Sequence, residues 1–481
     1  MAVVGAGAAG LYTAMRAARE GASVLLVSAT PLAQSSSYWA QGGLAAALSE
    51  LDSPALHLAD TITAGRGAVK EAAARVLCDE APQAVDDLTR LGVSFDADRN
   101  GRLALGLEGG HSVRRIVHAG GAATGRRIIR QLSALVAEHP GIDVLEGRRA
   151  VAVLTGHGRS VGALLDDGRT IASGAIVLAT GGAAALWSRT TNPAGAPGGG
   201  LLLAFHAGAA LADLEFMQVH PTAVAAPNGA DGFLVTEAVR GEGAHLLDSS
   251  GQRFVDELAP RDEVARAVQR QMALTGAPSV DLDMREVDPA LFPNVVSALR
   301  QSGIDPEREL VPVAPAAHYM MGGIATDLNA RATVPGLYAV GECSCTGLHG
   351  ANRLASNSLT ECFVFGSRAA RAVLTEPGPD ADLLAAGVAE AKARADRPPP
   401  LHRASREALW RYAGLERDGE GLTHLTADPH PLVRLIGRSA ITRTESRGAH
   451  QRRDFPEPDP NLQGRHVTIA ARAEPGFETW E

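Results

Sequence analysis

The chain is poor in cysteine: its 481 residues include only four, Cys78, Cys343, Cys345 and Cys362. So few thiols exclude a disulfide framework in a chain of this length. Cys343 and Cys345 are one residue apart, but no second cysteine pair and no histidine cluster lies beside them in the sequence, so a zinc site is not expected. We expect reduced thiols that serve in packing, in a cytoplasmic protein without a metal.

Long apolar runs and an excess of basic residues are also lacking. No stretch approaches 18 apolar residues, so no membrane span is expected. Residues 2–5 already resemble a strand entering a turn, without a basic segment before them, so we expect no signal peptide and a short first strand. The net charge of -9 disfavours nucleic acid as a partner, because phosphate binding needs a basic face. An acidic protein can still bind an acidic small molecule if the site itself is cationic.

What the sequence does contain is typical of a globular protein with two or three domains. Hydrophobic residues make up 45% of the chain and charged residues 21%. Continuous apolar runs at 23–27, 175–179 and 336–340 indicate strands buried on both faces. The strand at 2–4 and the last two of these runs each lead into glycines. This arrangement predicts one nucleotide-binding sheet assembled from distant segments.

We therefore predict an α/β fold with three parts. A Rossmann-like domain is expected at residues 1–213 and 320–385, interrupted by an inserted α+β domain at 214–319. Arg397-Pro398-Pro399-Pro400 indicates a linker, because consecutive prolines cannot continue a helix. A C-terminal helical domain is expected at 398–481.

The C-terminal segment shows helical patterns at 401–412 and 431–443, followed by a polar, proline-rich tail. The chain contains no internal repeats.

A glycine-rich turn stands between the first strand and a helix predicted at 11–20, with the sequence Gly5-Ala6-Gly7-Ala8-Ala9-Gly10. In a GxGxxG motif the first glycine permits the tight turn, the second lets the backbone approach a pyrophosphate, and the third allows close helix packing. The helix N-terminus then offers free N–H groups to the phosphates. The alternative is a glycine-rich turn without a ligand. Ser28 replaces the usual acidic residue after the second strand; it can bond a ribose hydroxyl but does not distinguish NAD from FAD.

The following loop favours FAD: Ser35-Ser36-Ser37-Tyr38-Trp39-Ala40-Gln41-Gly42-Gly43. It resembles the superfamily of succinate dehydrogenases, fumarate reductases and aspartate oxidases, whose members keep an Ala-Gln-Gly-Gly loop against the flavin. Respiratory members carry a flavin-linking histidine where this chain has Ser36, so the resemblance implies non-covalent FAD. It also implies cofactor contacts at Thr180, Gly181, Glu342, Ser358 and Leu359. The alternative is a polar loop without a ligand.

Downstream motifs extend the resemblance to about residue 375 and again over 443–450. They imply a capping role for the inserted domain, substrate binding by His220, Thr236, His318 and Arg353, and catalysis by Arg261 with Glu237 and Arg240. A guanidinium fork fits a carboxylate with two hydrogen bonds, which suits Arg353 to a dicarboxylate. The histidines could instead be structural, Arg353 a surface residue, and Arg261 merely an ion-pair partner of Asp262.

Glu108 favours the aspartate oxidases within this superfamily. They carry a glutamate at this place, where it would meet the substrate's α-ammonium, whereas succinate and fumarate have no ammonium to neutralise. A solvated loop glutamate is the alternative. One departure is Gly199, which stands where relatives have an aspartate near the flavin.

The resemblance thus implies FAD-dependent oxidation of L-aspartate to iminoaspartate, with O2 (giving H2O2) or fumarate as electron acceptor, as the first step of de novo NAD synthesis. Arg353 with His318 would hold one substrate carboxylate, and His220 with Thr236 the other. Quinolinate synthase would receive the product. Two alternatives stay open: a soluble fumarate reductase or succinate dehydrogenase flavoprotein, and a flavin-binding protein without turnover.

Overall fold

The computed structural model describes residues 1–195, 197–226, 231–378, 380–393, 400–471 and 473–480. The predicted linker at 397–400 therefore lies outside the described residues, except for Pro400. None of the described helices combines the length and the hydropathy needed to span a membrane. All four cysteines are free thiols, and Cys362 is the one that is not fully buried.

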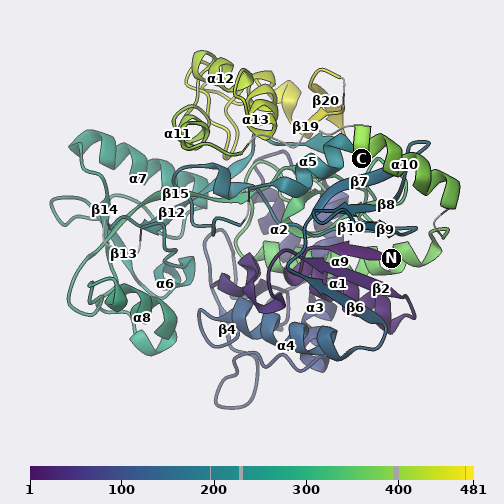
Figure 1. Ribbon diagram of the computed structural model, residues 1–481. Helices are drawn as coiled ribbons and strands as arrows, with labels where there is room; N and C mark the ends of the chain where they lie inside the picture. Colours follow the sequence, from purple (N-terminus) through teal and green to yellow (C-terminus); the bar gives the residue numbers. More distant parts are fainter. Residues whose placement is uncertain (196, 227–230, 379, 394–399, 472, 481) are drawn as a thin grey trace.

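A parallel five-stranded sheet, in the right half of Figure 1, forms the core of the larger, central unit and joins segments that are far apart in the sequence. The strand predicted at 2–4 and the three apolar runs predicted at 23–27, 175–179 and 336–340 form four of its strands. The fifth strand, at the edge, was not predicted. In spatial order the strands are β17 (Leu337–Ala339), β10 (Ile176–Leu178), β1 (Ala2–Val4), β2 (Val24–Ser28) and β6 (Ile142–Glu146). The predicted α/β class and the sheet built from distant segments are confirmed.

Side chains of this sheet alternate between two hydrophobic cores, as the pleat of a strand requires. Val3 and Leu26 face one core, whereas Val4 and Val27 face the other. The first core is closed by helices α1 (Ala8–Arg19), α3 (Glu71–Arg90), α4 (Thr124–Glu138) and α9 (Asn357–Ala372). The second continues into strands β7 (Ala150–Gly156), β8 (Arg159–Leu165) and β9 (Thr170–Ala172), with α5 (Gly199–His206), while α10 (Ala381–Ala393) packs on β7 and β8.

Residues 217–320 build a second, antiparallel sheet with its own core, on the left in Figure 1. Its strands, in spatial order, are β12 (Met217–Val224), β15 (Val311–Met320), β14 (Val280–Asp283) and β13 (His245–Leu247). The helices packed with it are α6 (Glu237–Gly241), α7 (Arg261–Thr275) and α8 (Pro293–Gln301). Strands β12 and β15 lead from this unit back to the central one.

The C-terminal segment contains helices where the sequence patterns indicate them, and two strands that the sequence did not indicate. Helices α11 (Arg403–Tyr412) and α13 (Pro431–Thr442) match the predicted patterns, and α12 (Gly419–Thr426) lies between them. The tail, however, forms strands β19 (Arg465–Ile469) and β20 (Gly476–Thr479). They complete a mixed sheet with β11 (Leu211–Ala212), β16 (Gly323–Ala325) and β18 (Ser344–Cys345). The backbone N–H and C=O groups of β19 are satisfied by pairing with β11, a distant segment that the local sequence of the tail does not indicate.

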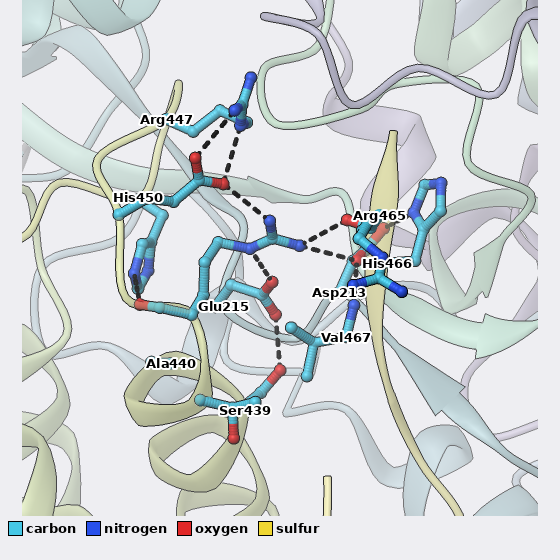
Figure 2. A network of polar contacts seen from close by, with 12 residues as sticks. Asp213, Glu215, Ser439, Ala440, Arg447, His450, Arg465, His466 and Val467 are labelled. Carbon is cyan, nitrogen blue, oxygen red and sulfur yellow. Dashed lines mark hydrogen bonds and ion pairs between the residues drawn. The ribbon is translucent and has the colours of Figure 1, made fainter. Parts of the chain in front are cut away.

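A buried ionic network fastens this C-terminal part to the chain just before β12 (Figure 2). Arg443 donates to Glu215 at 2.7 Å and to Glu445 at 2.9 Å, and all three side chains are fully buried. Ser439 donates to the second oxygen of Glu215 at 2.5 Å. The His466 ring lies 2.5 Å from Asp213. Buried carboxylates and guanidiniums are tolerated here because each has several partners.

Shorter elements complete the fold. They are strands β3 (Leu44–Ala45), β5 (Ile116–Val117) and β4 (Leu105–Gly106), which form one small antiparallel sheet, helix α2 (Pro54–Ala64), and the 3-10 turns η1 (Leu32–Gln34), η2 (Ser36–Trp39), η3 (Ala184–Leu186), η4 (Pro289–Leu291), η5 (Gly341–Cys343), η6 (Val373–Thr375) and η7 (Pro460–Leu462).

Candidate active site

The glycine-rich turn lies at the carboxyl ends of β1 and β10, directly before α1. Gly5 has a φ of +111°, and a Cβ built there would lie 2.2 Å from the Ala179 oxygen. A Cβ at Gly10 would lie 1.9 Å from the Gly5 oxygen. These glycines therefore set how closely α1 approaches the sheet, which leaves the α1 N-terminus available to an anion.

The loop at 35–43 packs against that helix N-terminus. Ser37 accepts a hydrogen bond from the Ala8 N–H at 3.1 Å. The Gln41 amide donates to the Leu234 oxygen at 2.7 Å. Within the described part of the chain, the Ser35 hydroxyl and the Gln41 side-chain oxygen are buried without a hydrogen-bond partner. Buried polar atoms of this kind indicate a missing partner at this place, and the group that the sequence implies is FAD.

The other predicted cofactor residues follow the neighbouring strands. Gly181, with φ +72°, and Gly199 at the start of α5 both border open space, since a Cβ at either would meet no atom within 4 Å. Glu342 accepts from the Met320 N–H at 3.0 Å, and burial raises the pKa of its carboxyl to about 7. Ser28, in contrast, uses its hydroxyl to donate to the Thr30 oxygen at 2.5 Å.

Glu108 lies beside both the flavin loop and the N-terminus of α9. Its Oε2 accepts from the Ser356 hydroxyl at 2.7 Å, and a Cβ at Gly42 would lie 3.7 Å from its Oε1. Ser356 occupies the position before α9 with a left-handed φ of +59°. The structure therefore brings Glu108, predicted to bind the substrate ammonium, next to the Ala-Gln-Gly-Gly loop.

Glu108 is ionised in this environment. Its burial would raise the pKa, but the His118 ring, the charge of Arg261 and the Ser356 hydrogen bond more than offset burial and hold the pKa at about 2. The side chain is only 1% exposed. Among the described residues, no lysine or arginine forms an ion pair with Glu108, and a buried carboxylate of this kind is suited to receive a cationic ligand group.

Arg353 and Arg261 meet at one amide. Arg353 Nε donates to Gln218 Oε1 at 3.1 Å, and Arg261 Nη1 donates to the same oxygen at 3.3 Å. Arg353 also donates to Ser358 at 2.7 Å and stacks over the Tyr319 ring at 4.6 Å. Burial and the neighbouring Arg261 lower the pKa of Arg353 to about 10, which leaves it charged at neutral pH. Two buried guanidiniums fixed side by side form a cationic site for carboxylates.

Glu237 connects Arg261 to Arg240. Arg261 donates to Glu237 Oε2, and Arg240 Nη2 lies 3.5 Å from Oε1 of the same carboxylate. Arg240 also donates to the Glu257 main-chain oxygen. The predicted series of Arg261, Glu237 and Arg240 is thus one continuous buried chain of polar contacts.

His220 and His318 lie together, with ring centroids 5.1 Å apart in an edge-to-face arrangement. Burial and the nearby arginines hold the pKa of each ring well below its ordinary value. The Thr222 N–H donates to His220 Nδ1 at 3.2 Å, and Thr191 Oγ1 lies 2.8 Å from His318 Nδ1. Thr236 is buried at the start of α6. The structure therefore gathers the predicted substrate residues into one region.

Sequence reasoning missed three residues of this region. Gln218 bridges both arginines, Ser356 holds Glu108, and His118 faces Glu108 from the end of β5. The spacing of Gln218 and His220, two residues apart on β12, could have placed both on one face of the strand. Ser356 lies in the segment 355–359, which the resemblance places against the flavin, but its bond to Glu108 was not predicted, and no local signal marks His118. The described residues hold no group of three or more His, Cys, Asp or Glu side chains arranged to bind a metal.

Comparison with known families matches both ends of the chain. A family described as "FAD binding domain" matches residues 1–359, and one described as "Fumarate reductase flavoprotein C-term" matches residues 430–478. The residues of the glycine-rich turn, the flavin loop, Glu108, both histidines and Arg353 all lie within the first match.

Comparison with individual proteins finds near full-length similarity. The chain is 46% identical to the L-aspartate oxidase of Caulobacter vibrioides, over 99% of this chain and 97% of that protein. It is 43% identical to the L-aspartate oxidase of Agrobacterium fabrum, over 97% and 93% respectively. A solved E. coli quinol fumarate reductase has a TM-score of 0.88 and 28% identity, covering 99% of this chain and 95% of that one. A quinol-fumarate reductase with menaquinol has a TM-score of 0.90 and 29% identity, covering 100% and 97%.

Proposed function

The chain belongs to the L-aspartate oxidase family, and on that premise we propose that it uses non-covalently bound FAD to oxidise L-aspartate to iminoaspartate. The observation that carries the proposal is Glu108, a buried, ionised carboxylate held by Ser356 beside the flavin loop and within the electrostatic reach of the arginine site. A dicarboxylate with an α-ammonium has the charges that this arrangement complements. Succinate and fumarate lack the cationic group.

The chain's own residues fit the cofactor. The α1 N-terminus, the Ser35 hydroxyl and the Gln41 side chain offer hydrogen-bonding groups, and the backbone at Gly181 permits close approach. Ser36 stands where respiratory relatives attach their flavin, which supports non-covalent binding. When bound, FAD supplies the two-electron oxidant that the reaction needs.

The substrate carboxylates are held by cationic and neutral donors. Arg353 with His318 holds one carboxylate, and His220 with Thr236 holds the other. His220 Nδ1 accepts the Thr222 N–H, so the proton of the neutral ring is on Nε2. Among the described residues no partner reaches this Nε2, which leaves it as a donor for a substrate oxygen. Fixing both ends of the substrate orients its Cα–H bond, which lowers the barrier through positioning.

Arg261 donates the proton that fumarate needs when it is reduced. A guanidinium cation carries N–H donors and has no lone pair to accept a proton, so Arg261 serves as a proton donor rather than as a base. Glu237 and Arg240 stand behind it and resupply the proton through the contacts described above. The unit at 217–320 acts as a cap that excludes water from this site, which strengthens its charge contacts.

The proposed place in metabolism follows the family. O2, giving H2O2, or fumarate reoxidises the cofactor, and iminoaspartate passes to a quinolinate synthase in the cytoplasm, as the first step of de novo NAD synthesis. The substrate is a small dicarboxylate, which the family supports directly.

Anaerobic mixing tests the function. The FAD-loaded protein is mixed with L-aspartate or with succinate, and the visible flavin absorbance is followed. We expect rapid bleaching by aspartate and slow or no bleaching by succinate. Bleaching by succinate alone would assign the protein to dicarboxylate dehydrogenation, and no bleaching by either would leave flavin binding without turnover.

A further inference from the structure

Two buried polar atoms without hydrogen-bond partners face each other at one edge of the site. His118 Nε2 lies 3.7 Å from Glu108 Oε1, and neither atom has a hydrogen-bond partner among the described residues. The separation is too long for a hydrogen bond. A nitrogen placed about 2.9 Å from both atoms would form a hydrogen bond with each. The pair therefore defines a place for a group with at least two N–H donors.

Local structure holds the His118 ring in this position. His118 directly follows β5, and its main-chain oxygen accepts from the Asp96 N–H at 2.8 Å. The ring crosses the paired strand β4 at Gly106, where a Cβ would lie 2.8 Å from the ring's Cε1. Any residue larger than glycine at 106 would displace the ring. The sequence of β4 thus makes room for an imidazole that reaches Glu108.

The two partners differ in what they can do with a proton. Glu108 is 1% exposed and lies within the field of the buried arginines, so it serves as an anchor for a cation and not as the proton acceptor. The His118 side chain is 15% exposed, so its ring reaches solvent. Imidazole is the side chain best suited to accept and release a proton near neutral pH.

We propose that His118 removes a proton from the α-ammonium of the bound amino-dicarboxylate while Glu108 holds that nitrogen. This inference rests on the proposed function and deepens it. One N–H bond of the ammonium breaks, its electron pair stays on the substrate nitrogen, and the proton adds to the lone pair of His118 Nε2. The resulting neutral amine has the lone pair that a C=N bond requires. The proton then leaves through the exposed edge of the ring to water.

The other charged groups near Glu108 do not compete for this role. Arg261, Arg240 and Arg353 interact electrostatically with Glu108, but a guanidinium cation has no lone pair with which to accept a proton. His111 is fully buried, its Nε2 lies 2.9 Å from the Ala355 oxygen, and burial lowers its pKa. His118 is the partly exposed imidazole at Glu108.

The test compares two half-reactions in the FAD-loaded protein carrying His118→Gln. Flavin reduction by L-aspartate should slow by about 100-fold or more, the usual size of a lost general base. Oxidation of the chemically reduced enzyme by fumarate, and binding of succinate seen in the visible spectrum, should not change, because neither ligand has an ammonium. His402→Gln, at an exposed position before α11, is the matched control.

A pH profile and chemical rescue give readouts that a structural role would not move. The aspartate rate of His118→Gln should rise about tenfold per pH unit while the substrate ammonium is the dominant form, because only the free amine then reacts. Added imidazole should restore the rate of His118→Ala. If His118→Gln does not fold, His118→Asn takes its place.

The possible results of these experiments separate the inference about His118 from the proposed function. Wild-type speed with aspartate in His118→Gln would overturn the inference, as would an equal loss of both half-reactions or an absence of rescue by imidazole. Wild-type protein that is not reduced by aspartate would refute the proposed function itself, and that result is seen before any variant is made.

Discussion

At the scale of single residues, several side chains of the site have one polar atom hydrogen-bonded within the protein and another left for the substrate. Thr222 holds one nitrogen of His220, and Ser356 holds one oxygen of Glu108. Gln218 and Ser358 hold Arg353. Each of these hydrogen bonds fixes the orientation of its side chain, so the atoms that bind substrate are already positioned before the substrate arrives.

His220 allows a test of this orientation. Replacing it with Phe removes the Nε2 donor from a charged acceptor, a loss of about 1.5–3 kcal/mol, or roughly 10- to 150-fold in succinate affinity. Because burial holds the pKa of His220 well below its ordinary value, the wild-type ring is neutral from pH 6 to 8, and affinity should be constant there. Spectral titration with succinate at several pH values measures both. A histidine titration within that range would contradict the assignment.

Glu342 gives the protein without cofactor a distinct pH dependence. Burial raises the pKa of its carboxyl from 4.5 to about 7. A raised folded pKa means that its contribution to stability is full below the unfolded pKa and is lost as pH rises toward 7, by about 3 kcal/mol in total. Urea unfolding from pH 4.5 to 7.5 should therefore show a steeper fall in the wild type than in Glu342→Gln. Parallel curves would show that Glu342 is not responsible.

At the scale of elements, helix α7 joins the outer unit to the central one at its first turn. Arg66, in the loop after α2, donates to Asp262 at 3.1 Å and to Glu263, the two residues that follow Arg261. The contact crosses between units and adjoins a catalytic candidate. It therefore sets how the α7 N-terminus lies over the site.

Replacing Arg66 with Ala should loosen this contact. We expect the KM for aspartate to rise several-fold with a smaller change in kcat, because binding includes closing the α7 end over the substrate. The wild-type KM should also rise with salt more steeply than that of the variant. Arg75→Ala, which removes an exposed pair with Glu71 within α3, is the control and should change neither value. Identical kinetics for Arg66→Ala and wild type would remove the contact from catalysis.

Elements with strong local signals were predictable from the sequence. The strands at 2–4 and 176–178 are apolar and end in glycines, so both their type and their meeting at one sheet edge could be inferred. The edge strand β6 and the tail strand β19 were missed because their residues are mixed and their partners are distant. In the same way, motifs indicated Glu108 and His220, while His118 and Ser356 depend on distances that only the fold creates.

At the scale of the whole molecule, the network around Arg443 ties the C-terminal part to the chain just before β12 (Figure 2). Glu215 stands two residues before β12, which carries Gln218 and His220. The Arg417 guanidinium donates to the Glu215 main-chain oxygen at 2.6 Å, which fixes the same point from a second direction. The active site thus depends on residues far from the chemistry.

Arg443→Met should test that dependence. It leaves the buried Glu215 and Glu445 without their shared cation, and we expect a loss of about 3–5 kcal/mol in unfolding free energy. Succinate affinity should fall as β12 loses its anchor. Arg438→Met, which breaks an exposed pair with Glu474, should lose less than about 1 kcal/mol. Urea unfolding and spectral titration measure both, and equal losses in the two variants would refute a special role for the network.

The pairing of β19 with β11 also constrains how the protein is made. A ribosome releases β11 long before it releases β19, so the neighbouring edge of β11 stays uncovered through most of synthesis. The nascent chain can build its nucleotide fold early, but the sheet that contains β11 is complete only after β19 has emerged and paired with it. The contact between Arg443 and Glu215, just before β12, likewise forms only after both of these distant segments have been made.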